Sequence, residues 1–336
     1  MTRPASGDVL DFRPAPQHRT IPTAVHLIRD LEALPAELRG GAISIGNFDG
    51  VHRGHARLAE RLVTLARAIG GPAIAFTFDP HPAKLLRPEA APTPLCWVER
   101  KAEMLAALGV DAVVAYPTGH ELLALSAPEF FTRIVQEGLA AGAIVEGHDF
   151  HFGRGRSGDT SLLRELCAAA GMQVDVVEPV MIDGEPVSSS RVRQLVASGD
   201  VGAANRLLTR PYRIRGVVGR GAARGTALGY PTANLQHIDT LLPREGIYAG
   251  LAHVEGESRP TALSVGPNPT FGESALKIEA FLLDFDGDLY GMPVQVDFLA
   301  RLRDIVRFAA PAELVAQMEQ DVLATRRVVE PVCGQG

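Results

Sequence analysis

Short apolar runs alternate with amphipathic stretches along the first half of the chain. The stretch after residue 54 places Leu58, Leu62 and Leu65 on one face, which is the spacing of an amphipathic helix. Strands are predicted at 41–48, 72–78, 111–117, 141–147 and 174–180, and helices at 55–70, 98–109, 128–139 and 160–171. Strands separated by helices of this length predict a parallel, doubly wound α/β sheet.

The pattern changes after about residue 210. Strand-like runs separated by Gly, Pro and Asp turns cover 214–221, 246–256, 260–266, 276–287 and 289–302. No helical period returns until 311–329. Short strands without intervening helices predict a small antiparallel barrel with a C-terminal helix. The segment 190–208 has a helical pattern and joins the halves, so the chain divides into two domains of different class.

The composition excludes several classes of protein. At 336 residues the chain is long enough for about two domains, and no uncharged apolar run approaches the roughly 18 residues of a membrane span. The N-terminus lacks the apolar segment of a secretory signal. Three scattered cysteines (Cys96, Cys167, Cys333) fit a reducing cytoplasm, and a net charge of −6 argues against nucleic-acid binding by bulk electrostatics. We therefore expect a cytoplasmic protein without nucleic-acid or membrane partners.

Lysine is nearly absent from the chain. Lys84, Lys101 and Lys277 are the only three, and every other basic residue is arginine. A codon-composition bias is the plain explanation. We nevertheless expect phosphates to be bound by arginine forks or backbone N–H groups rather than by ammonium groups.

The first candidate site is GNFDGVHRGHARL (46–58), between a predicted strand and a predicted helix. Parallel sheets bind ligands at the carboxyl ends of their strands, and a helix N-terminus offers free N–H groups to phosphate. His52 and His55 project to the same side of the first turn, where they can donate to a phosphate as its charge develops. The alternative is a surface turn with two solvated histidines. A zinc pair is disfavoured because no third ligand or Glu stands at the required spacing.

A second group lies in VSSSRVRQL (187–195). Its serines can cap the following helix, which is a purely structural explanation. Arg191 and Arg193, however, lie in the first helical turn, where the helix dipole disfavours cations by roughly 0.3–1 kcal/mol each. Cations placed there beside hydroxyl groups favour a bound polyphosphate.

Four segments together resemble the adenylyltransferase domain of the bifunctional prokaryotic riboflavin kinase/FAD synthetase family: GNFDGVHRGH, TFDPHP (77–82), GHDFHFGRGRSGD (147–159) and VSSSRVR. That domain belongs to the HxGH nucleotidyltransferase superfamily, so the resemblance implies transfer of AMP from ATP to FMN with release of pyrophosphate. It implies that His52 and His55 hold the ATP phosphates. The other residues it assigns to ATP are Gly46, Phe48, Asp49, Asp149, Ser189, Ser190 and Arg193. The FMN phosphate is already an anionic nucleophile, so no general base is needed.

The barrel half contains a second constellation. GRGAARGTALGYPTANL (219–235) is Gly-rich but fits neither a P-loop nor a dinucleotide fingerprint, and a flexible barrel loop is the alternative. Thr232 and Asn234 face the same way in an extended segment, and their oxygens suit Mg²⁺ bound to nucleotide phosphates. Glu279, in an otherwise apolar strand, is either partnered structurally or a general base with a raised pKa. The run DFDGD (284–288) predicts a hairpin turn rather than a calcium loop.

PTANL, PREGIYAG (243–250), SVGPNPTFG (264–272) and KIEAFLLDFDGDLYG (277–291) resemble the riboflavin kinase domain of the same family, a six-stranded barrel. The resemblance implies that Glu279 takes the proton from the riboflavin 5′-hydroxyl as it attacks the γ-phosphate, and that Arg303 lies near the flavin. The residues it assigns to ATP are Gly221, Gly225, Thr232 and Asn234, with Mg²⁺ at the last two. The implied domains are 20–208 for the adenylyltransferase and 209–336 for the kinase.

We therefore expect a bifunctional enzyme whose substrates and products are ATP, riboflavin, FMN and FAD. Two alternatives are an adenylyltransferase whose barrel only senses flavin, and an RNA-binding barrel that uses the arginines between 206 and 224. The intact PTAN motif and Glu279 argue against the first. The acidic charge and the lack of aromatic residues among those arginines, apart from Tyr212, argue against the second. The enzyme hypothesis requires a cavity beside the histidine pair or beside the threonine–asparagine edge.

Overall fold

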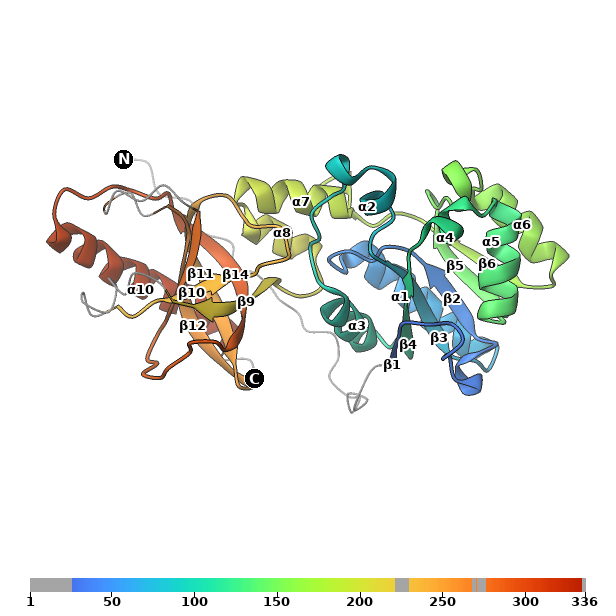
Figure 1. The fold of residues 1–336 in the computed structure, drawn as a ribbon, viewed down its shortest axis with the longest axis horizontal. Coiled ribbons are helices and arrows are strands. Elements are labelled where there is room, and N and C mark those ends of the chain that lie inside the picture. Colours follow the sequence, from blue (N-terminus) through green and yellow to red (C-terminus); the bar gives the residue numbers. More distant parts are fainter. Residues whose placement is uncertain (1–25, 221–229, 268–269, 271–275, 334–336) are drawn as a thin grey trace.

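The protein consists of an α/β domain and a β-barrel, with two helices between them (Figure 1). The structure is a computed structural model, and it describes residues 26–220, 230–267, 270 and 276–333. The barrel and the α/β domain lie side by side along the longest axis of the molecule. Both predicted architectures are therefore confirmed.

The α/β domain is built on a six-stranded parallel sheet in the order β1-β4-β3-β2-β5-β6. Its strands are β1 (His26–Ile28), β2 (Ala42–Ile45), β3 (Ala73–Asp79), β4 (Ala112–Pro117), β5 (Ala143–Gly147) and β6 (Gln173–Val177). Five of the six were predicted. The pattern missed β1 because three residues are too few to show a period. Ile74 and Phe76 pack on one face and Ala73 and Ala75 on the other, so both faces are apolar and both are covered.

Helices and short helical turns surround the sheet. They are η1 (Ala36–Leu38), α1 (Arg53–Ala68), α2 (Ala83–Leu86), η2 (Pro88–Ala90), α3 (Val98–Ala107), α4 (His120–Ala124), α5 (Ala127–Phe130), η3 (Phe131–Gly138), η4 (Arg154–Arg156) and α6 (Thr160–Ala169). The predicted helix 128–139 occurs as α5 continued by η3, which is a π-helix. The order of the strands reverses between β2 and β5. Open α/β sheets bind ligands in the crevice at such a switch point.

The connection between the domains consists of α7 (Ser189–Ser198) and α8 (Val201–Leu207). The predicted helical segment breaks at Gly199, whose φ of +87° suits a residue without a side chain. A small hairpin precedes it, formed by β7 (Met181–Ile182) and β8 (Glu185–Pro186). Val192 and Val196 of α7 belong to the same hydrophobic cluster as the barrel interior. The connecting helices are therefore packed firmly against the barrel.

The barrel is closed by six antiparallel strands in the order β10-β13-β12-β11-β14-β9. Its strands are β9 (Tyr212–Gly219), β10 (Ala233–Gln236), β11 (Gly246–Val254), β12 (Glu257–Gly266), β13 (Lys277–Leu282) and β14 (Pro293–Arg303). Inward residues such as Ile278 and Ala280 are buried, while the alternate residues of the same strand are only half-buried. This period of two is the pattern that predicted the strands.

The hairpin expected at DFDGD is wrong. The strands on either side of it, β13 and β14, are not neighbours: β13 pairs with β10 and β12, and β14 pairs with β9 and β11. The segment 283–292 is a longer connection that passes β9 and β10. Local turn chemistry cannot reveal which strands will pair across a barrel.

The C-terminal helix α10 (Pro311–Cys333) packs on the outside of the barrel against β11, β12 and β14. Val329 contacts Leu251 and Leu299 there and forms a small apolar cluster. Within the described ranges, no helix combines the length and the apolar character needed to cross a membrane.

Candidate active sites

The loop after β2 has an unusual backbone. Phe48, Gly50 and Val51 have φ values of 45°, 80° and 39°, all in the left-handed region. Glycine adopts that region freely, but Phe48 and the β-branched Val51 do so at a cost of about 1–3 kcal/mol each. Such strain persists where the surrounding structure fixes it, and it is common at ligand sites.

His52 and His55 cap the N-terminus of α1 reciprocally. The Nδ1 atom of His52 accepts from the backbone N–H of His55, and the Nδ1 atom of His55 accepts from the N–H of His52, both at 3.3 Å. The rings stack with centroids 3.6 Å apart. Since each Nδ1 acts as an acceptor, the proton of each neutral ring must be on Nε2. Each imidazole therefore keeps one N–H donor for a ligand.

Burial keeps both imidazoles neutral at physiological pH. Loss of solvent lowers the pKa of His52 to about 4, and the charge of Arg193 acts in the same direction. Burial and the neighbouring His52, with a smaller effect from Lys101, hold the pKa of His55 well below its ordinary value. The alternative of two solvated histidines is therefore wrong.

Asp49 connects the loop after β2 to two other segments. Its carboxylate accepts the backbone N–H groups of Leu95 (3.0 Å) and Cys96 (3.3 Å) and forms an ion pair with Arg193 of α7. Its own carbonyl accepts the hydroxyl of Ser189 at 2.9 Å. The motifs around residues 49 and 189, which are 140 positions apart in the sequence, therefore meet in space.

The two arginines of α7 already have protein partners, which corrects one argument made from the sequence. Arg191 donates to the carbonyl of Ile182 (2.8 Å) and pairs with Glu185, so it fastens the β7–β8 hairpin. Arg193 pairs with Asp49 and donates to the carbonyl of Thr93 (3.0 Å). These contacts offset the unfavourable helix dipole, so the position of the arginines alone does not require a polyphosphate.

The serines of α7 divide their roles. The Ser188 hydroxyl accepts the N–H of Arg191 and is the N-cap of α7, which agrees with the capping role that the sequence analysis gave as the alternative to ligand binding. Ser190 is exposed at the start of the helix. Asp149 is also exposed, just beyond the carboxyl end of β5. Gly46 lies at the corresponding end of β2, on the other side of the switch point.

Glu146 is a buried carboxyl group at the switch point that the sequence analysis did not single out. It is only 2% exposed, and it accepts the N–H of Ile45 at 2.6 Å, bridging β5 and β2. Burial raises its pKa well above the ordinary value for Glu. A carboxylate inside the apolar run AIVEG was the signal that could have revealed it.

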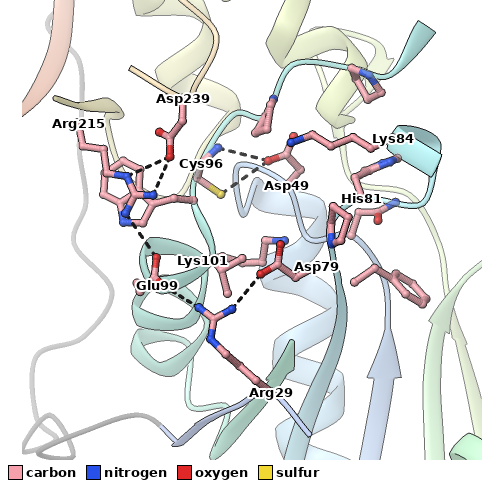
Figure 2. A pocket seen from close by; sticks show the side chains of 17 residues that line it. Arg29, Asp49, Asp79, His81, Lys84, Cys96, Glu99, Lys101, Arg215 and Asp239 are labelled. Atoms are coloured by element: carbon pink, nitrogen blue, oxygen red, sulfur yellow. Dashed lines mark hydrogen bonds and ion pairs between the residues drawn. The ribbon is translucent and has the colours of Figure 1, made fainter. Parts of the chain in front are cut away.

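A cavity of about 240 Å³ opens beside the loop after β2 (Figure 2). Asn47 and Asp49 line one side, and the TFDPHP segment lines another with Asp79 and His81. Arg215 and Asp239 of the barrel half complete the wall. The α/β half of the chain therefore does not form this cavity alone.

Two lysines line this cavity, although the sequence analysis expected phosphates to be bound without ammonium groups. Lys84 is exposed, whereas Lys101 is 6% exposed and donates to the hydroxyl of Thr77 at 3.1 Å. Lys101 lies on the buried stripe of α3 together with Ala102 and Leu105. A lysine on the apolar face of a predicted helix was the signal that could have revealed it.

Charged side chains tie the two halves together across the cavity. Arg29 bridges Asp79 (2.9 Å) and Glu99 (2.7 Å), and Arg215 bridges Glu99 (3.5 Å) and Asp239 (2.6 Å). The guanidinium of Arg215 also lies 4.9 Å from the centre of the Trp97 ring. Of these pairs, Arg215–Glu99 joins the barrel to the first turn of α3.

The second constellation lies on one rim of the barrel. Strand pairing places a single row of residues around it: Arg303, Ile247, Ser264, Glu279, Asn234 and Gly219. Glu279 and Asn234 are directly opposite each other, so their Cβ atoms are about 5 Å apart. Both are half-buried on the outer face, while their chain neighbours point into the core. The sequence identified both residues, but only the register shows that they are adjacent.

Two hollows adjoin this rim. Thr232 lines one of about 300 Å³ together with Phe285, Asp286 and Tyr290. Asn234 lines another of about 340 Å³ together with Arg220 and Lys277. The threonine–asparagine edge is therefore accessible, as the enzyme hypothesis required. Gly221 and Gly225 fall outside the described residues.

Arg303 is three strands away from Glu279 along the same row. Its guanidinium forms a bidentate pair with Asp321 of α10, at 2.9 and 2.6 Å. It also lies 6.0 Å from the centre of the Phe308 ring. The pair with Asp321 fastens α10 to this rim.

Comparisons with known proteins cover both halves of the chain. Residues 34–191 match the family model described as FAD synthetase, and residues 208–329 match the model described as riboflavin kinase. A bifunctional riboflavin kinase/FMN adenylyltransferase of Pseudomonas fluorescens is 39% identical over 308 residues, which cover 91% of this chain and 99% of that protein. The protein of the same name from Escherichia coli K12 is 34% identical, with coverage of 89% and 95%.

A solved structure supports the arrangement of the whole chain. The crystal structure of a Streptococcus pneumoniae protein, titled as a macrolide-efflux protein, matches with a TM-score of 0.80 and 29% identity. The match covers 90% of this chain and 98% of that one. Both domains and the helices between them therefore have a counterpart in one solved structure.

Proposed function

The chain belongs to the bifunctional riboflavin kinase/FMN adenylyltransferase family, and from that premise we propose which of its residues carry out the two reactions. Its riboflavin kinase half transfers the γ-phosphate of ATP to riboflavin and gives FMN. Its FAD synthetase half transfers AMP from a second ATP to FMN and gives FAD and pyrophosphate. We assign the second reaction to residues 20–208 and the first to residues 209–336.

In adenylyl transfer, His52 and His55 bind the ATP phosphates through their Nε2–H groups. The observation that carries this assignment is the reciprocal capping of the two rings, which holds both in the donor tautomer at the N-terminus of α1. A phosphate oxygen of FMN attacks the α-phosphorus of ATP while the bond from that phosphorus to pyrophosphate breaks. The two Nε2–H groups then stabilise the negative charge that develops on the leaving pyrophosphate. We assign Asp149, Ser190 and the backbone at Gly46 to the same nucleotide.

Phe48, Asp49, Ser189 and Arg193 hold this loop in place. Asp49 and Ser189 are joined to one another and Asp49 is paired with Arg193, so we assign the three chiefly a positioning role beside the nucleotide. Phe48 contacts the His55 ring edge-to-face, with centroids 5.3 Å apart. Its aromatic face fixes the orientation of that imidazole.

In riboflavin phosphorylation, Glu279 accepts the proton of the 5′-hydroxyl as the oxygen attacks the γ-phosphorus and ADP leaves. An alcohol is a weak nucleophile at neutral pH and needs this base, whereas the FMN phosphate does not. Asn234 lies opposite Glu279 in the register, so a nucleotide bound at Thr232 and Asn234 would meet a hydroxyl deprotonated by Glu279. Arg303 is assigned to the flavin side of the same rim.

Mg²⁺ fits the kinase rim through oxygen ligands. The Thr232 hydroxyl and the Asn234 amide oxygen are hard ligands, and Mg²⁺ commonly takes one or two protein oxygens together with substrate phosphates and water. In the described part of the chain, no cluster of three or more His, Cys, Asp or Glu side chains could hold a metal. The metal would shield the negative charge of the phosphates. We also propose a cytoplasmic location, in which the free thiols of Cys96 and Cys167 stay reduced.

Two variants of the full chain test the assignment. Glu279→Gln should abolish FMN formation from riboflavin and leave the conversion of supplied FMN to FAD largely intact. The double variant His52→Ala, His55→Ala should stop FAD synthesis and let FMN accumulate. Chromatography of the products from riboflavin and Mg·ATP measures both. Loss of both activities in Glu279→Gln, or FAD synthesis at the wild-type rate in the double variant, would refute the placement of that site.

A further inference from the structure

Among the residues that the structure describes, no carboxylate pairs with the buried ammonium group of Lys101. Its side chain is 6% exposed and lines the cavity of Figure 2. Throughout the described ranges, its one hydrogen bond is to the Thr77 hydroxyl, which in turn donates to the carbonyl of Asn47 at 3.2 Å. An ammonium carries three donors, so two remain for a ligand.

Each carboxylate around the cavity is paired with an arginine. Asp79 and Glu99 pair with Arg29, and Asp239 pairs with Arg215. Asp49 pairs with Arg193. In the described cavity wall, no acidic side chain forms an ion pair with Lys101, whose hydrogen bond is to Thr77. A buried, uncompensated charge is unfavourable, and an anionic ligand would remove this cost.

The ammonium lines the cavity and also acts electrostatically on the histidine pair. After burial and the effect of His52, the charge of Lys101 is the next cause that lowers the pKa of His55. The same charge also contributes, after burial and other neighbours, to the lowered pKa of His81 in the cavity wall. A ligand phosphate at Lys101 would therefore be close to phosphates held by His55.

The chemistry of the cavity wall favours the flavin substrate over ATP as the source of this phosphate. Phe78, Pro80 and Trp97 line it beside the charged groups, and flat apolar surfaces of this kind suit an aromatic ring system. The ATP phosphates are assigned to the histidine pair at the N-terminus of α1, and neither histidine lines this cavity.

We propose that Lys101 binds the phosphate of FMN, and that this contact makes the adenylyltransferase select FMN over riboflavin. The inference rests on the proposed function of this half of the chain. One FMN phosphate oxygen forms a bond to the α-phosphorus of ATP, and the bond from that phosphorus to the pyrophosphate oxygen breaks with its electron pair. The ammonium of Lys101 offsets the charge of the phosphate during the approach of two anions. It positions the nucleophile and transfers nothing.

The test compares Lys101→Met with Lys84→Met in the full chain. Both variants remove an ammonium group from the wall of the same cavity, but only Lys101 is buried. In the conversion of FMN to FAD, Lys101→Met should raise the KM for FMN by about 10- to 150-fold, the range for a hydrogen bond to a charged group, with the KM for ATP within twofold of wild type. Lys84→Met should leave both KM values within threefold. Kinase activity, measured in the same samples, should not change.

The proposal and a purely structural role of Lys101 predict different melting temperatures. Under the proposal, removing an unpaired buried charge should leave the melting temperature of the ligand-free protein unchanged or raise it, and Lys101→Arg should recover part of the FMN affinity. A lower melting temperature with no rescue by Lys101→Arg would overturn the proposal. If Lys101→Met does not fold, Lys101→Gln, which keeps a polar group beside Thr77, takes its place with the same expected KM values.

Two further results would overturn the proposal. One is an unchanged KM for FMN in Lys101→Met, and the other is an increase in the KM for ATP alone, which would assign the ammonium to the nucleotide. Both are distinct from failure of the proposed function, in which the wild-type chain itself would make no FAD from FMN and ATP.

Discussion

Protonation of the buried histidine pair should weaken the fold in mild acid. His52 is 6% exposed, and its Nδ1 must stay unprotonated to accept the N–H of His55 at the start of α1. Its pKa is about 4 in the folded chain and about 6.5 in the unfolded chain. The unfolded state therefore binds the proton first as the pH falls. Stability contributed by the neutral imidazole is full above pH 6.5 and is lost progressively down to about pH 4.

The size of the effect follows from the two pKa values. Between pH 7 and pH 5, a single group that shifts from about 6.5 to about 4 lowers the free energy of unfolding by about 2 kcal/mol. His55 has its pKa lowered too and adds to the loss in the same direction. Replacing His52 by Asn keeps a side chain that caps well at this position but removes the titration. His52→Asn should therefore lose about 2 kcal/mol less than wild type over this pH range.

Urea denaturation between pH 5 and pH 7 measures this, with the fluorescence of the single tryptophan as the probe. Trp97 is 8% exposed beneath Arg215, so its emission reports loss of the α/β domain and its contact with the barrel. His120→Asn is the matched control, because His120 is exposed at the first position of α4. It should follow wild type at every pH. If His52→Asn also loses as much stability as wild type between pH 7 and pH 5, the imidazole is not held neutral by burial and the reasoning is wrong.

Three further predictions concern groups that hold the site together. Glu146→Gln keeps an acceptor for the N–H of Ile45 but cannot ionise. Because the folded chain holds the pKa of Glu146 far above its ordinary value, the wild type should lose stability as the pH rises above about 4.5, whereas the variant should not. Melting temperatures at pH 4.5 and pH 7 measure the difference. Asp49→Ala leaves Arg193 without its buried partner and should cost about 3–5 kcal/mol in urea denaturation; a cost below 1 kcal/mol would contradict the role given to this pair. Gly199→Ala should destabilise more than Gly70→Ala, since both have positive φ but only at Gly199 would a Cβ lie 2.9 Å from the Tyr248 hydroxyl; equal melting temperatures would refute that.

The sequence predicted most elements because their periods are strong. The run 72–78 is apolar on both faces and became a central strand of the sheet. The barrel strands alternate apolar and polar residues, as in β13. The hairpin at 284–288 was wrong because strand pairing in a barrel joins residues far apart in the chain. The three residues of β1 carry too little pattern to be recognised.

The sequence predicted the site residues that lie in short motifs and missed those that depend on contacts between distant segments. His52, His55, Thr232, Asn234 and Glu279 lie in short motifs whose spacing can be read directly. Lys101 and Glu146 belong to no recognisable motif. What distinguishes them is that they are charged residues buried in the fold, and the sequence indicates burial only weakly. The sequence analysis assigned Arg193 to a bound phosphate, and the structure shows that it also pairs with Asp49, 144 residues away in the chain.

The sequence by itself determined the two fold classes, their order along the chain and the local motifs, because these depend on periods of two to four residues and on neighbouring side chains. The tertiary structure alone decided which of those motifs meet. Parallel strand order brings the loop after β2 beside the end of β5, and the packing of α7 brings Arg193 onto Asp49. The barrel register places Glu279 opposite Asn234. Contacts of this kind arise from packing between distant segments. Burial, which lowers the pKa of His52 and removes Lys101 from solvent, exists only once the chain has folded.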